Sequence, residues 1–266
     1  MDIVHAIILA LIQGITEFLP ISSSGHLILP QAILGWPDQG LAFDVAVHIG
    51  TLAAVVIYFR SLIADIVVGG VKTLGGHFDD PNGRLAWMIV LATIPAGIAG
   101  LVFNDLIETH LRSALVIATT TIIFGVVLGV ADRNGGGDKT LQQIGWRAAL
   151  IIGCAQALAL IPGTSRSGIT ITAALFLGFS RDDSARFSFL ISIPIILLSG
   201  GFKGLELMGS ADVDWGLIGV GVLVSGISAY LCIYYFLAFI NRLGMMPFVI
   251  YRLLLGLALF GIILLR

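Results

Sequence analysis

Residues 13–26 read QGITEFLPISSSGH, and residues 162–170 read PGTSRSGIT. Each run interrupts a long apolar region with proline, glycine and hydroxyl side chains. Proline removes a backbone donor and glycine loosens the backbone, so neither region is expected to form an ordinary uninterrupted helix. The fold therefore depends on how the chain is arranged around these two breaks.

The composition places the chain in a membrane. Hydrophobic residues make up 58% of its 266 residues and charged residues only 11%, with a mean hydropathy of +1.03. Such a chain has too few polar groups to cover a soluble globule. The net charge of -2 and the lack of a basic run argue against a nucleic-acid partner. Cys154 and Cys232 lie in apolar stretches, so we expect no disulfide.

Six apolar stretches are long enough to cross about 30 Å of hydrocarbon. They lie at about residues 41–60, 85–103, 113–131, 184–201, 215–239 and 247–265. After the first break only residues 27–35 remain before Trp36-Pro37-Asp38, and such a short helix covers about 14 Å. This favours a re-entrant hairpin at each break over a broken helix that crosses the membrane. We therefore expect an all-α integral membrane protein with six transmembrane helices plus two re-entrant helical hairpins.

The lysines and arginines in the loops distinguish these two arrangements. With re-entrant hairpins, ten of them lie on one face, Arg242 and Arg252 included, and three on the other; with two further crossings the division is eight to five. Because positive charge concentrates in cytoplasmic loops, the re-entrant arrangement is favoured. It puts both termini and the mouth of the first hairpin on the outer side of the membrane. It also leaves Arg166 as the one cation within the membrane.

The two breaks also indicate an internal repeat. Pro20 and Gly25 recur as Pro162 and Gly168 at separations of 142 and 143 residues, and three spanning helices follow each break. Three crossings is an odd number, so the second unit is inverted relative to the first. Such repeats bring their hairpin tips together near the middle of the bilayer. The expected units are a single membrane domain, 1–266, and within it a first inverted repeat at 1–131 and a second at 141–266.

The first break carries residues suited to acid, base and nucleophile chemistry. Gln13 and Glu17 are four residues apart and share a helix face. An acid at that depth usually faces a cavity or a partner. Serines 22–24 lie within a few residues of His26. A serine nucleophile with a base and a histidine nucleophile with hydroxyl donors both fit this spacing.

The second break supplies a cation. Arg166, flanked by two serines, carries a guanidinium whose fork matches phosphate oxygens, and exposed N–H groups of the loop add donors. A structural salt bridge with Glu17 is the alternative. Because one carboxylate cannot use all the donors gathered there, a phosphate is favoured.

Two further polar residues follow on the first spanning stretch. Asp44 and His48 are four residues apart and so share a helix face. We expect them to support the site from behind or to help hold a metal ion, and a paired structural role is the alternative.

The two quoted runs resemble the signature motifs of the bacitracin-resistance type undecaprenyl pyrophosphate phosphatases, and the resemblance covers essentially the whole chain. It implies a multi-pass enzyme of the bacterial inner membrane that hydrolyses undecaprenyl pyrophosphate to undecaprenyl phosphate and inorganic phosphate. That reaction recycles the carrier lipid for peptidoglycan synthesis and confers bacitracin resistance. A divalent cation, Mg²⁺ or Ca²⁺, is implied as cofactor. The implied partners are the polyprenyl pyrophosphate and membrane lipids, and a homodimer is left open.

The resemblance also implies roles for particular residues. Glu17 and His26 match the essential acid and histidine, Ser23 the serine discussed as nucleophile, and Arg166 the phosphate-binding arginine. Gln13 stands where many members have a glutamate, so metal ligation rests mainly on Glu17 and on phosphate oxygens. The expected substrate-binding residues are Gln13, Ser22, Ser24, Gly163, Thr164, Ser165, Ser167 and Thr170.

A transporter of lipid phosphates is the alternative from another functional class. Inverted repeats whose hairpins meet at mid-membrane are a transporter architecture, and fold alone does not decide function. The serine, histidine and glutamate gathered opposite Arg166 favour the enzyme, because a carrier needs the cation but has no need of a nucleophile with a base.

Overall fold

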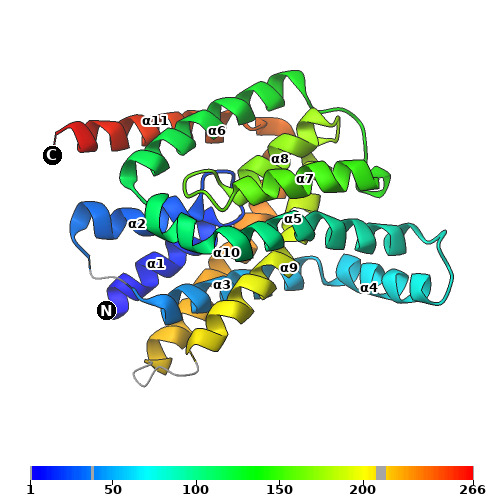
Figure 1. Cartoon of the computed structure of the whole chain (residues 1–266), viewed down its shortest axis with the longest axis horizontal. Coiled ribbons are helices and arrows are strands. Elements are labelled where there is room, and N and C mark those ends of the chain that lie inside the picture. Colours follow the sequence, from blue (N-terminus) through cyan, green and yellow to red (C-terminus); the bar gives the residue numbers. More distant parts are fainter. Residues whose placement is uncertain (1, 37–38, 208–213, 266) are drawn as a thin grey trace.

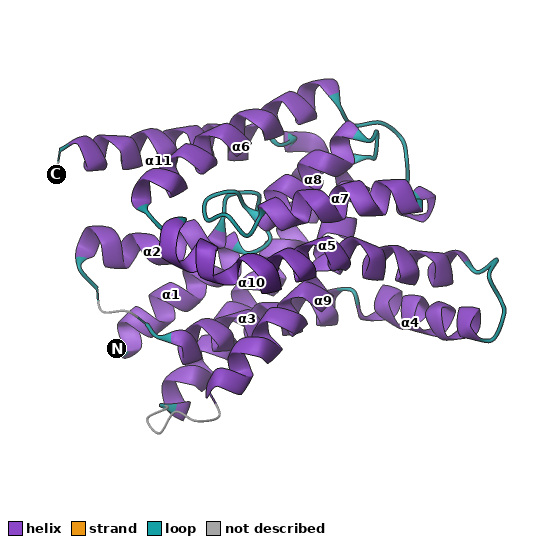
Figure 2. Cartoon of the chain, in the orientation of Figure 1, coloured by secondary structure: helices purple, strands orange, loops and turns teal. Residues whose placement is uncertain are grey.

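The computed structural model describes residues 2–36, 39–207 and 214–265, and Pro37 and Asp38, which mark the end of the expected first hairpin, lie outside these ranges. The described chain is helical apart from its loops, and it contains no strand (Figure 2). The helices are α1 (Ile3–Thr16), α2 (Ser23–Leu34), α3 (Leu41–Tyr58), α4 (Arg60–Leu74), α5 (Pro81–His110), α6 (Ala114–Asn134), α7 (Trp146–Leu158), α8 (Arg166–Phe176), α9 (Arg181–Leu207), α10 (Trp215–Leu243) and α11 (Met246–Leu264), with a short 3₁₀ helix, η1, at Leu141–Gln143.

Six helices are long and apolar enough to cross a membrane, namely α3, α5, α6, α9, α10 and α11. Each coincides with one of the six expected stretches. Helix α5 begins earlier than expected because Asp80 caps its first turn, accepting hydrogen bonds from the N–H groups of Asn82 (2.9 Å) and Gly83 (3.2 Å). The bond from Gly83 holds the pKa of Asp80 below its ordinary value. The expected all-α, multi-pass membrane fold is confirmed.

Two pairs of shorter helices surround the breaks. Helices α1 and α2 pack together, as do α7 and α8. The loops that join them lie at the centre of the molecule (Figure 1). The four helices have 14, 12, 13 and 11 residues, which corresponds to lengths of about 17 to 21 Å, well under the roughly 30 Å of hydrocarbon. These lengths favour hairpins that turn back, while re-entry and inversion of the two halves stay predictions.

The first helix of each hairpin packs against a spanning helix from the other half of the chain: α1 lies on α10, and α7 lies on α5. The first contact is close. A Cβ atom added to Gly14 of α1 would stand 1.9 Å from Ser228 Oγ and 2.6 Å from the carbonyl oxygen of Ser225, both on α10. This exchange between halves brings the tip of the first hairpin to the tip of the second.

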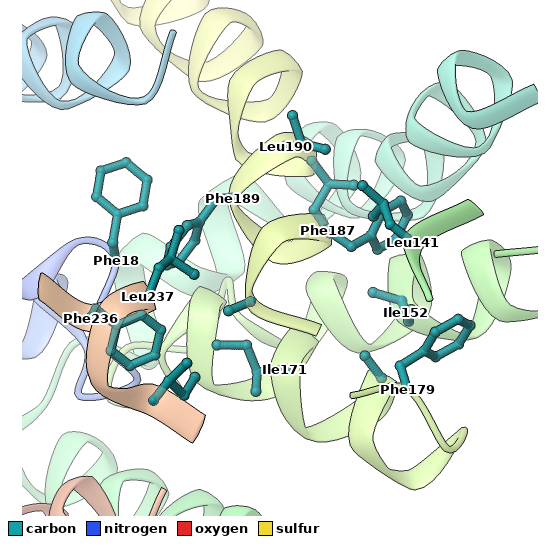
Figure 3. Packing of buried hydrophobic residues seen from close by; sticks show 14 of the residues in the cluster. Phe18, Leu141, Ile152, Ile171, Phe179, Phe187, Phe189, Leu190, Phe236 and Leu237 are labelled. Carbon is teal, nitrogen blue, oxygen red and sulfur yellow. The ribbon is translucent and has the colours of Figure 1, made fainter. Parts of the chain in front are cut away.

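A buried cluster of aromatic rings packs next to the loop between α1 and α2. Phe18, next to Glu17 in sequence, packs edge to face on Phe189 of α9 with ring centroids 5.1 Å apart, and Phe189 in turn contacts Phe236 of α10 (Figure 3). Phe18 and Phe189 are fully buried. Large apolar side chains elsewhere point outward, among them Leu101, Leu223 and Leu257, as expected where lipid is the solvent.

Two features differ from the sequence expectations. Helix α4 lies between the expected spans at 41–60 and 85–103, where no helix was predicted, and it packs against α5. Arg252, counted above among the loop charges, is fully buried within α11. Removing it leaves nine cationic loop residues against three for the re-entrant arrangement and eight against four for the alternative. The preference survives, but Arg166 is not the only cation within the membrane.

Candidate active site

The two loops end in the same unusual backbone turn. Ser22 and Ser165 have φ angles of 75° and 71°, and they are the only described residues other than glycine with a positive φ. Each is the N-cap of the following helix: Ser22 Oγ accepts from the N–H of Gly25 (3.4 Å), and Ser165 Oγ accepts from that of Gly168 (3.1 Å). A serine held there costs about 1 to 3 kcal/mol of backbone strain, which persists only where the surroundings enforce it.

Glu17 is the centre of the side-chain network between the loops. Its Oε1 accepts from Arg166 Nη2 at 3.2 Å, and its Oε2 accepts from Ser23 Oγ at 2.7 Å and from Gln13 Nε2 at 3.0 Å. Gln13 and Glu17 are buried. The structure therefore brings together Gln13, Glu17, Ser23 and Arg166, four of the residues singled out from the sequence.

Arg166 is held from two sides. Besides its ion pair with Glu17, its Nη1 donates to the carbonyl oxygen of Ser188 on α9 at 3.1 Å. Thr170 lies one turn further along α8, and its hydroxyl is hydrogen-bonded to the hydroxyl of Ser188 at 2.7 Å. The guanidinium is thus fixed in direction, and Ser188 is a contributor that the sequence pattern did not reveal.

Some of the residues expected to bind substrate also make contacts that hold the two loops in place. Ser167 Oγ donates to the carbonyl oxygen of Leu19 at 2.8 Å and so ties the second loop to the first. Gly163, with a φ of 89°, leaves no space for a side chain, because a Cβ atom would stand 2.2 Å from Thr120 Oγ1. Thr164 is different: its Oγ1 is buried and has no hydrogen-bond partner within the described part of the chain.

His26 lies outside the Glu17 network. Its Nδ1 stands 2.7 Å from the carbonyl oxygen of Ser22, and its Nε2 stands 2.6 Å from the hydroxyl of Tyr251 on α11, whose ring is stacked on the imidazole. Since a carbonyl only accepts, Nδ1 carries the hydrogen, and in the neutral imidazole Nε2 then accepts from Tyr251. Tyr251 was not anticipated, because a partner 225 residues away leaves no trace in local spacing.

Ser24, and Asp44 and His48 on α3, form no hydrogen bond with Glu17 among the described residues. Ser24 is exposed, and its hydroxyl lies 3.3 Å from that of Ser22. Asp44 Oδ1 accepts from Gln39 at 3.0 Å, and His48 Nδ1 contacts the carbonyl oxygen of Asp44 at 2.7 Å. No hydrogen bond in the described chain links Asp44 or His48 to Glu17.

The residues that could hold a metal are few. The described chain contains no group of three or more His, Cys, Asp or Glu side chains placed to bind an ion. Gln13 Oε1, however, is a buried carbonyl oxygen without a hydrogen-bond partner in these ranges, and its amide nitrogen is already bonded to Glu17. One amide oxygen and one carboxylate are therefore adjacent at the site.

Two apolar cavities lie along the first helix, and one of them reaches His26. One, of about 570 Å³, lies between α1 and α11 and is lined by His26 and Tyr251 at one side; the other, of about 510 Å³, lies between α1, α10 and α11. Both are lined mainly by apolar side chains and have Leu11, Ile15, Leu19 and Phe248 in common; together they are called the groove below.

Known proteins match the chain along nearly its full length. An undecaprenyl-diphosphatase of Teredinibacter turnerae is 66% identical over 261 residues, which cover 98% of this chain and 99% of that protein. An undecaprenyl-diphosphatase of Saccharophagus degradans is 63% identical over 263 residues, 99% of each chain. Undecaprenyl-diphosphatase 1 of Pseudoalteromonas translucida is 59% identical over 260 residues, covering 97% of this chain and 98% of that protein.

The family comparison leads to the same group. Residues 6–258 match the model of the bacitracin resistance protein BacA, a range that includes both loops, all six long apolar helices nearly to their ends, and every residue of the Glu17 network. The chain belongs to the BacA family of bacitracin resistance proteins.

Proposed function

We propose that this protein hydrolyses the terminal phosphate from undecaprenyl pyrophosphate, yielding undecaprenyl phosphate and inorganic phosphate, at the outer face of the bacterial inner membrane. The observation that carries the proposal is the network in which Ser23, Arg166 and Gln13 converge on Glu17 where the two loops meet. Relatives at 59 to 66% identity bear the name of this activity. The release of the carrier lipid for peptidoglycan synthesis, and with it bacitracin resistance, follows from the reaction.

The charge distribution around the network favours a bound diphosphate. Arg166 offers a fixed cationic fork. Helices α2 and α8 both begin at the loops, immediately after Ser22 and Ser165. The first N–H groups of a helix have no partner within the helix, and they carry its positive dipole end, so two such ends provide an anion site.

Ser23 is the nucleophile that the geometry supports best, because its hydroxyl already donates to Glu17 Oε2 at 2.7 Å. Glu17 takes the proton as Ser23 Oγ bonds to the terminal phosphorus. The bond from that phosphorus to the bridging oxygen breaks, and undecaprenyl phosphate leaves with the electron pair. Water then cleaves the phosphoserine, which releases inorganic phosphate and restores the Ser23 hydroxyl.

His26 is the second candidate nucleophile, favoured by its position beside the apolar groove. Its Nε2 accepts from Tyr251 at 2.6 Å, so an attack through that nitrogen requires the tyrosine hydroxyl to move away. Phosphoserine survives acid and phosphohistidine does not. Rapid-quench trapping with labelled substrate therefore separates the routes, and trapping neither would point to direct attack by water.

A divalent cation, Mg²⁺ or Ca²⁺, is part of the proposal. Glu17 accepts three hydrogen bonds, which leaves its carboxylate one further acceptor position, and Gln13 Oε1 beside it lacks a partner within the described residues. Such cations take roughly six to eight oxygen ligands, so these two fit a site that phosphate oxygens complete. When bound, the ion neutralises charge on the phosphate oxygens.

The groove between α1, α10 and α11 offers a place for the polyprenyl chain. It is apolar, it borders His26 at one side, and its two cavities hold about 510 and 570 Å³. A bound tail would keep the diphosphate at the loops while the chain stays among apolar side chains. The relatives' names favour hydrolysis over the transport alternative.

Phosphate release from undecaprenyl or farnesyl pyrophosphate by detergent-purified protein tests the proposal. We expect Mg²⁺- or Ca²⁺-dependent release in the wild type, loss of about 100-fold or more in Glu17→Ala, Ser23→Ala and Arg166→Ala, and little change in Ser199→Ala. Ser199 lies on the spanning helix α9, and among the described residues its hydroxyl donates only to the carbonyl oxygen of Ile196 in the same helix. Folded wild-type protein that released no phosphate with any of these lipids and metals would refute the proposal.

A further inference from the structure

Arg252 is a fully buried arginine without a carboxylate partner. No ion pair in the described chain includes it. Among the described residues its guanidinium donates only to backbone oxygens: Nε to Thr121 (3.1 Å), Nη1 to Pro20 (3.1 Å), and Nη2 to Gly163 (2.9 Å) and Thr164 (3.0 Å). Burying an unpaired charge is costly, so its presence calls for a role other than ion pairing.

The positions of the acceptors suggest that role. Pro20 belongs to the first loop and lies two residues before Ser22, while Gly163 and Thr164 lie immediately before Ser165 in the second. Ser22 and Ser165 are the two strained serines, with φ angles of 75° and 71°. One guanidinium therefore holds both loops just ahead of the residues whose backbone is least favourable.

We propose that Arg252 is a positioning residue: it fixes the two loops relative to each other, so that Ser23 and Arg166 both meet Glu17. This role rests on the proposed phosphatase function. Ser23 and Arg166 each directly follow a strained serine, so a small rotation at Ser22 or Ser165 would carry either donor away from the carboxylate. Arg252 itself forms no hydrogen bond with Glu17, Ser23 or Arg166.

Arg252→Lys separates this role from a role of charge alone. A lysine keeps the positive charge, but its single ammonium cannot replace a planar fork that reaches four oxygens on three segments. We expect kcat for phosphate release from farnesyl pyrophosphate to fall by about 100-fold, as for a misplaced reacting group, with KM changed by less than about threefold. Wild-type kcat in the folded lysine variant would overturn the proposal.

Two glycines on α6 provide a gentler test with a matched control. A Cβ atom on Gly125 would stand 3.1 Å from Arg252 Cβ and 3.4 Å from its Nε, whereas one on Gly129, a turn further along, would stand 3.2 Å from Val249 Cγ1. Gly125→Ala and Gly129→Ala thus add the same methyl group between the same two helices, and only the first displaces Arg252. We expect kcat to fall by about tenfold in Gly125→Ala alone; equal falls in both variants would contradict the proposal.

Hydrogen–deuterium exchange supplies a readout that does not depend on activity. In Arg252→Lys and Gly125→Ala, peptides covering residues 16–26 and 160–170 should both exchange faster than in wild type, and in Gly129→Ala neither should. Faster exchange in only one loop, or in neither, would refute the coupling of the loops by Arg252. If the wild type released no phosphate, the phosphatase proposal would fail while the exchange experiment still decided the role of Arg252.

Discussion

Ser23 and Arg166 stand 143 residues apart, each as the first residue after a strained serine, and both donate a hydrogen bond to Glu17. The same turn thus presents a hydroxyl in one loop and a cation in the other. The acid has no counterpart, because Leu160 stands 143 residues after Glu17. Two similar loops therefore form one asymmetric site, with the acid on one side and the fixed cation on the other.

The fork of Arg166 should matter beyond its charge. Arg166→Lys keeps a cation but cannot donate to Glu17 and to the carbonyl oxygen of Ser188 in the same geometry. We expect kcat/KM for phosphate release to fall by about 100-fold, since one preorganised donor of this kind contributes about that much. Steady-state phosphate assays in detergent measure it.

Arg186→Lys is the matched control for this change. Arg186 pairs with Asp182 one turn away on α9, and its side chain is 39% exposed. Exposed pairs of this kind contribute little, so kcat/KM should stay within about twofold of wild type. Comparable losses of kcat/KM in both variants would indicate a general effect of replacing arginine and would contradict a special role of the Arg166 guanidinium.

The ion pair between Glu17 and Arg166 should show strong coupling in stability. Its side chains are 7% and 14% exposed, so Glu17→Gln or Arg166→Gln alone leaves a buried charge unpaired and should lower the free energy of unfolding by about 3 kcal/mol. The double variant should lose less than the sum by about 1 to 3 kcal/mol, yet remain inactive. Denaturant unfolding of the four proteins gives the coupling, and additive losses would count against a mutually compensating pair.

The sequence was sufficient for the membrane class and the six spanning helices, because 20-residue apolar stretches leave few alternatives. It also predicted that Glu17, Ser23 and Arg166 lie close together, because the two polar breaks resemble each other and the tips of such a repeat meet. The roles of Tyr251 and Ser188 were not predicted. Their contacts with His26 and Arg166 depend on how helices distant in the sequence pack together. Arg252 was misassigned because it lies near the start of its span, where a cation is usually read as a loop charge, although an arginine within an apolar stretch also signals a buried role.

The strain at Ser165 predicts an unusual order of substitutions. Alanine there loses the hydroxyl that caps α8 but keeps the side chain that disfavours a φ of 71°, whereas glycine loses the same cap and accepts that φ readily. Ser165→Gly should therefore be more stable than Ser165→Ala by about 1 kcal/mol. Thermal unfolding in one detergent compares them. Equal stability, or a more stable alanine variant, would mean that the loop relaxes out of this backbone conformation.

The free oxygen of Gln13 leads to a prediction about the metal requirement. Gln13→Glu places a second carboxylate beside Glu17, and affinity for hard cations rises with the number of charged oxygen ligands. The Mg²⁺ concentration that gives half-maximal phosphate release should fall by about tenfold, whereas in Gln13→Ala, which removes the oxygen, it should rise. A titration from chelator-treated protein measures both shifts. The opposite signs are what distinguish ligation from a general disturbance of the site, because a disturbance would weaken metal dependence in the same direction in both variants.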